Sequence, residues 1–275
     1  HMGRLILVSN RLPVKFEDGP NGKSVTRSSG GLITGLDPLH NNSDSIWIGY
    51  PETELDDNSS KLLTDMRLEP VDIPSDEYAG YYEGFSNGAI WPLFHYLLEY
   101  CEFNPEAFAA YKRVNERFAE KILEHAQDDD TIWVHDYQLM LVPAMLREKL
   151  PSARIGFFLH IPFPSSEVLR VMPQREELLR GLLGADLIGV HTHEYADHLS
   201  RSFRRILGLE ASEKQRSPTK WNESLLNTSG ESAMRKSFSV LTDSITPKDC
   251  RTSSKRLNLF SKESQDGETA LFSSR

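Results

Sequence analysis

The stretch Ile155-Gly156-Phe157-Phe158-Leu159-His160-Ile161-Pro162-Phe163-Pro164 decides the fold of this chain. It begins as a run of strand-forming residues without polar alternation, which is typical of a parallel strand buried on both faces. Pro162 and Pro164 lack an N–H group and disfavour helix before them, so we expect an extended turn there and a helix N-cap at Ser165. Ligands bind at the carboxyl ends of strands in open parallel sheets. His160 is therefore a candidate site residue, although a lone histidine is more often structural.

Working outward from this stretch, short apolar runs alternate with helical patterns. The runs that predict strands lie at residues 5–8, 45–50, 67–73, 131–134, 155–159 and 186–190. The patterns that predict helices lie at residues 77–85, 104–126, 139–150, 176–183 and 195–207. This alternation predicts an α/β domain over residues 1–210, with a Rossmann-like, doubly wound parallel sheet and a site at the strand ends.

The composition changes after about Glu210, where serines and threonines become frequent and periodic apolar positions become rare. Such a segment buries too little apolar surface to offset an ordering cost of roughly 1–2 kcal/mol per residue. We therefore predict that residues 211–275 form a disordered tail, with a short helix near residues 233–241.

Composition also limits the class of function. The chain has 275 residues and a formal net charge of -9, which argues against nucleic acid as the main partner but allows a local basic pocket for a phosphorylated small molecule. No apolar run reaches the roughly 20 residues of a membrane helix, and no secretory leader is recognisable, so a cytoplasmic location is expected. The two cysteines, Cys101 and Cys250, have no spacing that predicts a disulfide framework or a metal site.

The strand ends and the loops beside them carry residues suited to a phosphorylated sugar. A basic group and a glycine loop suit phosphate, aromatic rings suit the faces of a sugar, and a carboxylate accepts hydrogen bonds from hydroxyls. These candidates are Arg11, Gly30, Gly31, Trp47, Tyr82, Trp91, Asp136 and His160. Physics alone leaves two alternatives, a phosphosugar or nucleotide-sugar site and a dehydrogenase-like Rossmann domain, but the latter lacks G-x-G-x-x-G after the first strand.

Each candidate also has a purely structural interpretation. Arg11 can pair with a surface acid, and Asp136 can cap the following helix. The tryptophans and Tyr82 can be packing residues, and for Trp133, inside an apolar strand, we prefer the core. A last group resembles a metal cluster on paper but is interpreted as structural, because its members follow separate elements: His135, His191 and His193.

Six motifs in order resemble those of the trehalose-6-phosphate synthases. They are Ser9-Asn10-Arg11-Leu12-Pro13, Ser29-Gly30-Gly31-Leu32, Tyr81-Tyr82 with Phe85-Ser86-Asn87, Trp91-Pro92 with Phe94-His95-Tyr96, Trp133-Val134-His135-Asp136-Tyr137 and the opening stretch from Gly156. The match spans residues 3 to about 209. That family consists of retaining glycosyltransferases with the GT-B fold, in which two Rossmann-like domains face each other, and the chain resembles the N-terminal half.

The resemblance implies transfer of glucose from UDP-glucose to glucose 6-phosphate, which gives trehalose 6-phosphate and UDP without a cofactor or metal ion. It implies that Arg11 pairs with the acceptor phosphate and that Asp136 binds acceptor hydroxyls. It also implies an acceptor pocket shaped by Trp47, Tyr82 and Trp91. Donor binding is implied for the backbone at Gly30 and Gly31 and for His160, which would contact the donor glucose. His160 and Asp136 are thus the expected catalytic residues.

The resemblance ends near Glu210, where the family's second, donor-binding domain is not recognisable. Because catalysis needs donor and acceptor held together, we expect this chain alone to be weakly active or inactive, as a truncated enzyme that contacts UDP-glucose mainly through a missing domain. The alternative is a non-catalytic phosphosugar-binding or regulatory module. The sequence leaves the donor base and the oligomeric state open, although an apolar face left uncovered would favour homo-oligomers.

Overall fold

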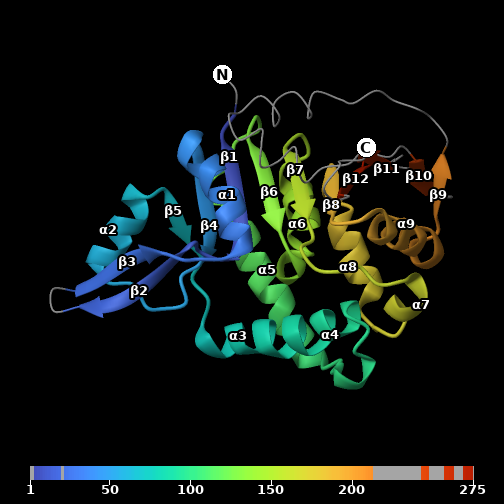
Figure 1. Ribbon diagram of the computed structural model, residues 1–275, viewed down its shortest axis with the longest axis horizontal. Coiled ribbons are helices and arrows are strands. Elements are labelled where there is room, and N and C mark those ends of the chain that lie inside the picture. The colour runs from blue at the N-terminus through green and yellow to red at the C-terminus, as the bar shows by residue number, and fades with distance from the viewer. Residues whose placement is uncertain (1–2, 20–21, 213–242, 248–256, 263–268, 275) are drawn as a thin grey trace.

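The computed structural model describes residues 3–19, 22–212, 243–247, 257–262 and 269–274. Its centre is a parallel sheet in the order β5-β4-β1-β6-β7-β8 (Figure 1). The strands are β1 (Leu5–Arg11), β4 (Ser45–Tyr50), β5 (Leu68–Pro70), β6 (Thr131–His135), β7 (Arg154–Phe158) and β8 (Leu187–Val190). This arrangement confirms the predicted Rossmann-like parallel sheet.

The helices alternate with the strands, and four of them lie where the sequence predicts, at residues 104–126, 139–150, 176–183 and 195–207. They are α1 (Gly31–Asn42), α2 (Asp57–Asp65), α3 (Ser75–Ala79), α4 (Trp91–Phe94), α5 (Pro105–His125), α6 (Val142–Lys149), α7 (Ser166–Leu169), α8 (Arg175–Leu182) and α9 (His193–Leu207). Short 3₁₀ turns cover Leu98–Tyr100 and Tyr137–Leu139. The predicted cap at Ser165 is confirmed, because its side chain accepts a hydrogen bond from the amide of Val168 at the start of α7.

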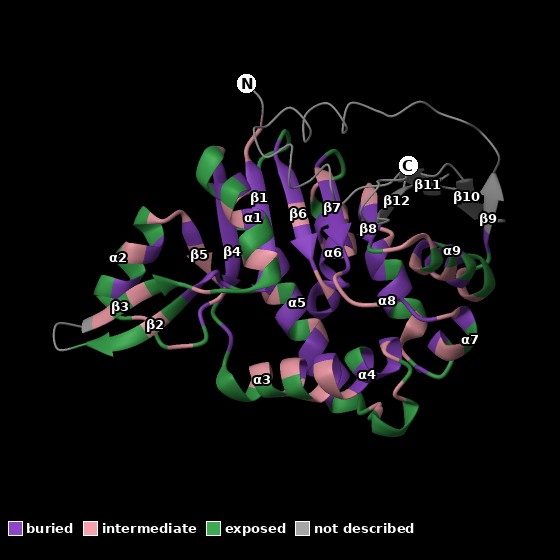
Figure 2. Ribbon diagram, in the orientation of Figure 1, coloured by how far each residue is buried: buried purple, intermediate pink, exposed green. Residues whose placement is uncertain are grey.

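Both faces of the central strands are buried, which explains why their sequences show no polar alternation (Figure 2). On β1, Ile6 and Val8 belong to a large cluster that includes side chains of α5, α6, α8 and α9. Leu5 and Leu7 point the other way, into a smaller cluster with α1 and α2. Beside that smaller cluster lies a hairpin of β2 (Val14–Gly19) and β3 (Gly22–Arg27).

A π-helix (Gly80–Ile90) joins α3 to α4, where the sequence predicts an ordinary helix leading into an aromatic loop. Two of its glycines face α5 at close range. A Cβ atom on Gly80 would lie 2.9 Å from Cβ of Ala110, and one on Gly84 would lie 2.9 Å from Cβ of Ala107. The glycines therefore allow this wide helix to pack directly on α5, near the carboxyl ends of the strands (Figure 1).

Beyond β8 the sheet continues with antiparallel strands in the order β12-β11-β10-β9. They are β9 (Leu209–Ser212), β10 (Asp243–Pro247), β11 (Leu257–Lys262) and β12 (Thr269–Ser274). These strands lie within the tail that was predicted to be disordered. The prediction rested on the serine-rich composition and gave little weight to the short strand-forming runs at 257–260 and 269–272. The rest of the tail, including the helix expected at 233–241, lies outside the described residues.

Within the described part of the chain, no helix has both the length and the apolar character that a membrane span requires.

Candidate functional site

Arg11, the last residue of β1, lies among tyrosines at the carboxyl edge of the sheet. Its guanidinium carbon is 5.0 Å from the ring centroid of Tyr82, its side chain hydrogen-bonds Tyr78, and its Nε lies 3.0 Å from Oε1 of Glu52. Tyr78 stacks between Tyr82 and Tyr50, at centroid distances of 5.3 and 4.3 Å. We call Arg11, Tyr50, Glu52, Tyr78 and Tyr82 the arginine cluster.

The arginine cluster presents a solvent-exposed positive charge that rests on stacked tyrosine rings. The Arg11 side chain is 47% exposed and that of Glu52 is 44% exposed, so their ion pair contributes little and an incoming phosphate can replace it. Asn10 links two tyrosines below Arg11, because its Oδ1 accepts a hydrogen bond from Tyr81 Oη at 2.8 Å and its Nδ2 donates one to Tyr78 Oη at 3.4 Å. The expected pairing of Arg11 with a surface acid and a role in phosphate binding are thus compatible.

Three histidines lie at the carboxyl ends of the neighbouring strands β6, β7 and β8 and form a second group, which we call the histidine row: His135, His160 and His191. Nδ1 of His135 lies 3.0 Å from Nε2 of His160, and the His191 ring hydrogen-bonds the backbone of His160. Burial lowers the pKa of His160 to about 3 and lowers the pKa values of His135 and His191 below that of free histidine. The row is therefore neutral at physiological pH.

The sequence pattern alone assigns His135, His191 and His193 to separate elements, whereas the structure brings the rings of His135 and His191 together with that of His160. The ring centroids of His135 and His160 are 5.3 Å apart, and those of His160 and His191 are 5.8 Å apart. The reason is the sheet order, because β6, β7 and β8 are consecutive neighbours whose carboxyl ends meet. Even so, no set of three or more histidine, cysteine or acidic side chains among the described residues is arranged to hold a metal ion.

Asp136 lies at the base of the histidine row in a strained conformation. Its φ angle of 78° is rare for a residue other than glycine. Its Oδ1 accepts hydrogen bonds from the amides of Tyr137 at 3.0 Å and His160 at 3.1 Å. Burial nevertheless raises the pKa of the Asp136 carboxyl to about 6. The carboxyl caps the turn after β6, as its structural interpretation predicts, and it also fixes the backbone of His160.

Helix α5 holds the loop that carries Asp136. The hydroxyl of the buried Tyr111 donates to the carbonyl of Tyr137 at 2.7 Å and accepts from the amide of Met140 at 3.1 Å. Oδ1 of Asn115, one turn further along α5, accepts from the amide of Leu141 at 3.2 Å. Backbone groups after β6 thus have fixed partners, and Asp136 is presented from a rigid support.

Tyr137 joins the turn after β6 to the π-helix and was missed as a candidate. Its hydroxyl donates to Oδ1 of Asn87 in the π-helix at 2.9 Å. Burial, followed by the charge of Asp136 and the nearby Tyr82, raises its pKa above that of free tyrosine. Tyr137 directly follows Asp136 in one of the six motifs, so its place in the motif was the signal that could have identified it.

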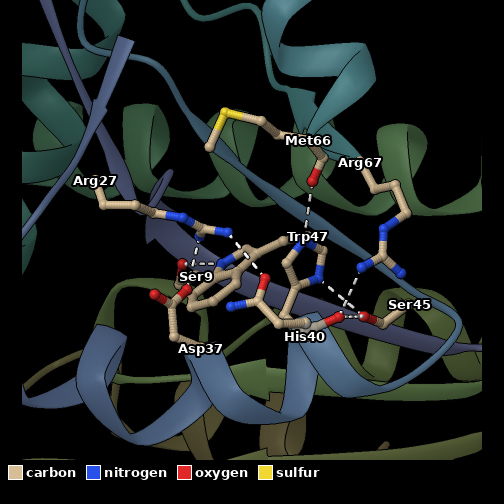
Figure 3. A network of polar contacts seen from close by, with 9 residues as sticks. Ser9, Arg27, Asp37, His40, Ser45, Trp47, Met66 and Arg67 are labelled. Carbon is tan, nitrogen blue, oxygen red and sulfur yellow. Dashed lines mark hydrogen bonds and ion pairs between the residues drawn. The ribbon is translucent and has the colours of Figure 1, made fainter.

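Trp47 was expected to shape the acceptor pocket, but the structure buries its side chain completely. Its indole lies in the smaller core cluster, edge-on to His40 at a centroid distance of 5.8 Å (Figure 3). His40 is itself held by Ser45 Oγ at 2.8 Å and the carbonyl of Met66 at 3.0 Å. Trp47 sits mid-strand in a strand with both faces covered, whereas Tyr50, at the end of the same strand, reaches the arginine cluster.

The Trp47 side chain still connects with Arg11 through the core. Its Nε1 donates to Ser9 Oγ at 2.8 Å (Figure 3). That hydroxyl in turn donates to the carbonyl of Arg11 at 2.7 Å. A buried tryptophan therefore helps to fix the backbone conformation at the residue that carries the positive charge.

The remaining candidates lie at the surface. Trp91 is 39% exposed and packs on His95 at a centroid distance of 4.0 Å. Gly30 and Gly31 are exposed at the amino end of α1, which has no side-chain cap. A Cβ atom on Gly31 would meet nothing within 4 Å, so this backbone is open to approach. Of the predicted residues, the structure brings Arg11 against Tyr82 and Asp136 against His160.

Comparison with known proteins gives one family. The model of glycosyltransferase family 20 matches residues 3–229. The alpha,alpha-trehalose-phosphate synthase [UDP-forming] A of Dictyostelium discoideum is 46% identical over 214 residues, which cover 76% of this chain and 29% of that protein.

Solved structures of similar proteins give the same result. A UDP-forming alpha,alpha-trehalose-phosphate synthase of Burkholderia xenovorans in complex with glucose-6-phosphate is 30% identical, with a TM-score of 0.63 over 77% of this chain and 45% of that one. An E. coli structure bound with UDP-2-fluoro glucose is also 30% identical, with a TM-score of 0.63 over 78% of this chain and 45% of that one. The chain spans less than half the length of each of these proteins.

Proposed function

The chain belongs to glycosyltransferase family 20, and from this premise we propose that it contributes the acceptor side of an enzyme that transfers glucose from UDP-glucose to glucose 6-phosphate. The products would be trehalose 6-phosphate and UDP. The observation that carries the proposal is the arginine cluster, in which a half-exposed cation lies over a tyrosine ring at the carboxyl edge of the sheet. A cation beside aromatic faces suits a sugar that bears a phosphate.

In this proposal the two groups of side chains have separate tasks. Arg11 pairs with the phosphate of glucose 6-phosphate, while Tyr82 and Tyr50 face the sugar and Trp91 closes the outer wall. Asp136 accepts hydrogen bonds from acceptor hydroxyls, and its rigid mounting on α5 supports this role. Trp47 acts from the core, through Ser9, on the backbone of Arg11.

The donor side is proposed for the histidine row and the start of α1. His160 contacts the glucose of UDP-glucose, and the exposed amides at Gly30 and Gly31 approach the diphosphate. The bond between C1 of the donor glucose and the diphosphate oxygen breaks, and a bond from C1 to the acceptor hydroxyl oxygen forms. The hydroxyl proton passes to the departing diphosphate, whose charge must be stabilised for the step to be fast.

Calorimetric titration with glucose 6-phosphate and, separately, with UDP-glucose tests this proposal on the full chain. Binding of glucose 6-phosphate that is lost in Arg11→Ala supports the acceptor role, with Lys15→Ala on the exposed hairpin as a matched control that keeps binding. A transfer assay follows. Because the chain spans less than half of each relative, binding of glucose 6-phosphate without transfer is expected of the acceptor side alone. Transfer by the chain would contradict the non-catalytic phosphosugar module, and binding of neither compound would contradict both functions.

A further inference from the structure

His135 and His160 share one hydrogen bond between two neutral rings. Nδ1 of His135 lies 3.0 Å from Nε2 of His160, and both rings are neutral because burial disfavours their charged forms. A neutral imidazole carries a proton on only one nitrogen. One ring must therefore donate and the other accept, and the choice decides which nitrogen of His160 carries its proton.

The other nitrogen of His135 distinguishes the two arrangements. Nε2 of His135 is buried and, among the described residues, has no hydrogen-bond partner. If His160 donated, the proton of His135 would have to sit on this Nε2 and would be a buried N–H without an acceptor. If His135 donates from Nδ1, its Nε2 is only an unused lone pair. Buried orphan N–H groups are rarer and costlier than unused acceptors, so the second arrangement is favoured.

We propose that His135 is a positioning residue that donates from Nδ1–H to Nε2 of His160 and so places the proton of His160 on Nδ1. Free histidine carries its proton mainly on Nε2, so His135 reverses the usual tautomer. His160 then offers an N–H donor to a sugar oxygen. This last step rests on the proposed function, in which His160 contacts the donor glucose, whereas the tautomer itself does not.

Neighbouring contacts leave this donor in a defined place. The amide of His160 donates to Oδ1 of Asp136, and the ring of His191 hydrogen-bonds the His160 backbone, so the main chain of His160 is held on two sides. No hydrogen bond to Nδ1 of His160 is formed within the described residues, although its Nε2 is engaged. Nδ1 is thus the nitrogen left to meet a ligand.

Long-range ¹H–¹⁵N correlation spectra of the full chain, labelled at histidine and recorded at pH 7, test the proposal directly. His160→Gln and His135→Asn assign the two rings. We expect His160 to be protonated on Nδ1 with a bare Nε2, and His135 likewise. A wild-type His160 protonated on Nε2 would overturn the proposal.

A matched pair of variants then tests the role of His135. The Asn side chain in His135→Asn places an N–H donor near the position of Nδ1, so His160 should keep its proton on Nδ1. His135→Leu removes the donor, so the proton should return largely to Nε2. An unchanged tautomer in a folded His135→Leu variant would contradict the proposal. Loss of fold in that variant leaves the decision to the wild-type spectrum.

Affinity for UDP-glucose separates this inference from the function on which its last step rests. We expect a loss of about tenfold in His135→Leu and a smaller loss in His135→Asn, as for one neutral hydrogen bond. If UDP-glucose binds but wild-type His160 is protonated on Nε2, the inference fails and the function stands. If the tautomer is as proposed but UDP-glucose does not bind, the donor role of His160 fails with the proposed function and only the tautomer assignment stands.

Discussion

The arginine cluster and the histidine row lie at the same edge of the sheet, but the first carries an exposed charge and the second is neutral. The Arg11 side chain is 47% exposed and keeps its charge beside tyrosines and a single exposed acid. His135 is buried and His160 is partly buried against it, and loss of hydration lowers the pKa values of both rings. The arginine cluster is thus suited to an anion, whereas the histidine row offers neutral polar atoms.

In the proposed function, this difference assigns the phosphate of the acceptor and the glucose of the donor to two regions of the same sheet edge. A cation with a replaceable partner favours phosphate, because a charged hydrogen bond is stronger than the exposed ion pair that it replaces. A neutral, partly buried donor distinguishes hydroxyl and ether oxygens by geometry, since a mispaired group removed from water is costly. Asp136 combines features of both groups, because its carboxyl can carry a charge but is largely removed from water and hydrogen-bonded.

The largest effect is expected from removing the charge of the arginine cluster. Arg11→Ala should weaken binding of glucose 6-phosphate by about 2–5 kcal/mol, at least roughly 30-fold, as for loss of one partner of a charge pair. Affinity for UDP-glucose should change little. Glu52→Gln is the matched control, because it frees Arg11 of its competing acid and should leave binding equal or tighter. Equal binding by Arg11→Ala and the wild type in calorimetry would place the phosphate elsewhere.

A smaller effect is expected from neutralising Asp136. Asp136→Asn should weaken binding of glucose 6-phosphate by about 1.5–3 kcal/mol, because a charged acceptor is lost. The free energy of unfolding at pH 7 should not fall, since asparagine tolerates the φ angle of 78° and removes a buried charge whose pKa is raised. Urea unfolding of the same variant checks this contrast. A clear loss of stability with unchanged affinity would make Asp136 a structural cap only.

The pH dependence of stability should carry the signature of the histidine row. The pKa of His160 falls from 6.5 unfolded to about 3 folded, so between these values the unfolded chain binds one more proton. Stability therefore rises with pH in this window, by about 1.4 kcal/mol per pH unit for one such histidine, and is lost as pH falls. His160→Gln should reduce the slope of unfolding free energy against pH by up to this amount.

Asp136 should change the stability with pH in the opposite direction to His160, over an overlapping pH range. Its carboxyl pKa rises from 3.8 to about 6 on folding, so between these values the folded chain binds the additional proton and stability falls as pH rises. Asp136→Asn should therefore steepen the same slope that His160→Gln flattens. If both variants change the slope in the same direction in urea unfolding at several pH values, the contrast between the two ionisations is wrong.

Much of the fold could be predicted from local pattern, because parallel strands buried on both faces leave uninterrupted apolar runs. The same property limited the prediction of the site. Every residue of β4 from Ser45 to Gly49 is buried, and only Tyr50 at its end is partly exposed, so residue type alone could not separate Trp47 from Tyr50. The histidine row depends on the order of strands in space, which spacing along the chain does not give.

The smallest effect should come from the buried connection between Trp47 and Arg11. Trp47→Phe and Ser9→Ala each remove the bond from Nε1 to Oγ, so a double-mutant cycle on unfolding free energy should give a coupling of about 0.5–1.5 kcal/mol. Affinity for glucose 6-phosphate should fall less in either variant than in Arg11→Ala, because Trp47 and Ser9 affect the ligand only by holding the backbone of Arg11. A Trp47→Phe variant with wild-type stability but an affinity as poor as that of Arg11→Ala would show that this indole meets the ligand, and the division between a buried support and an exposed cluster would then fail.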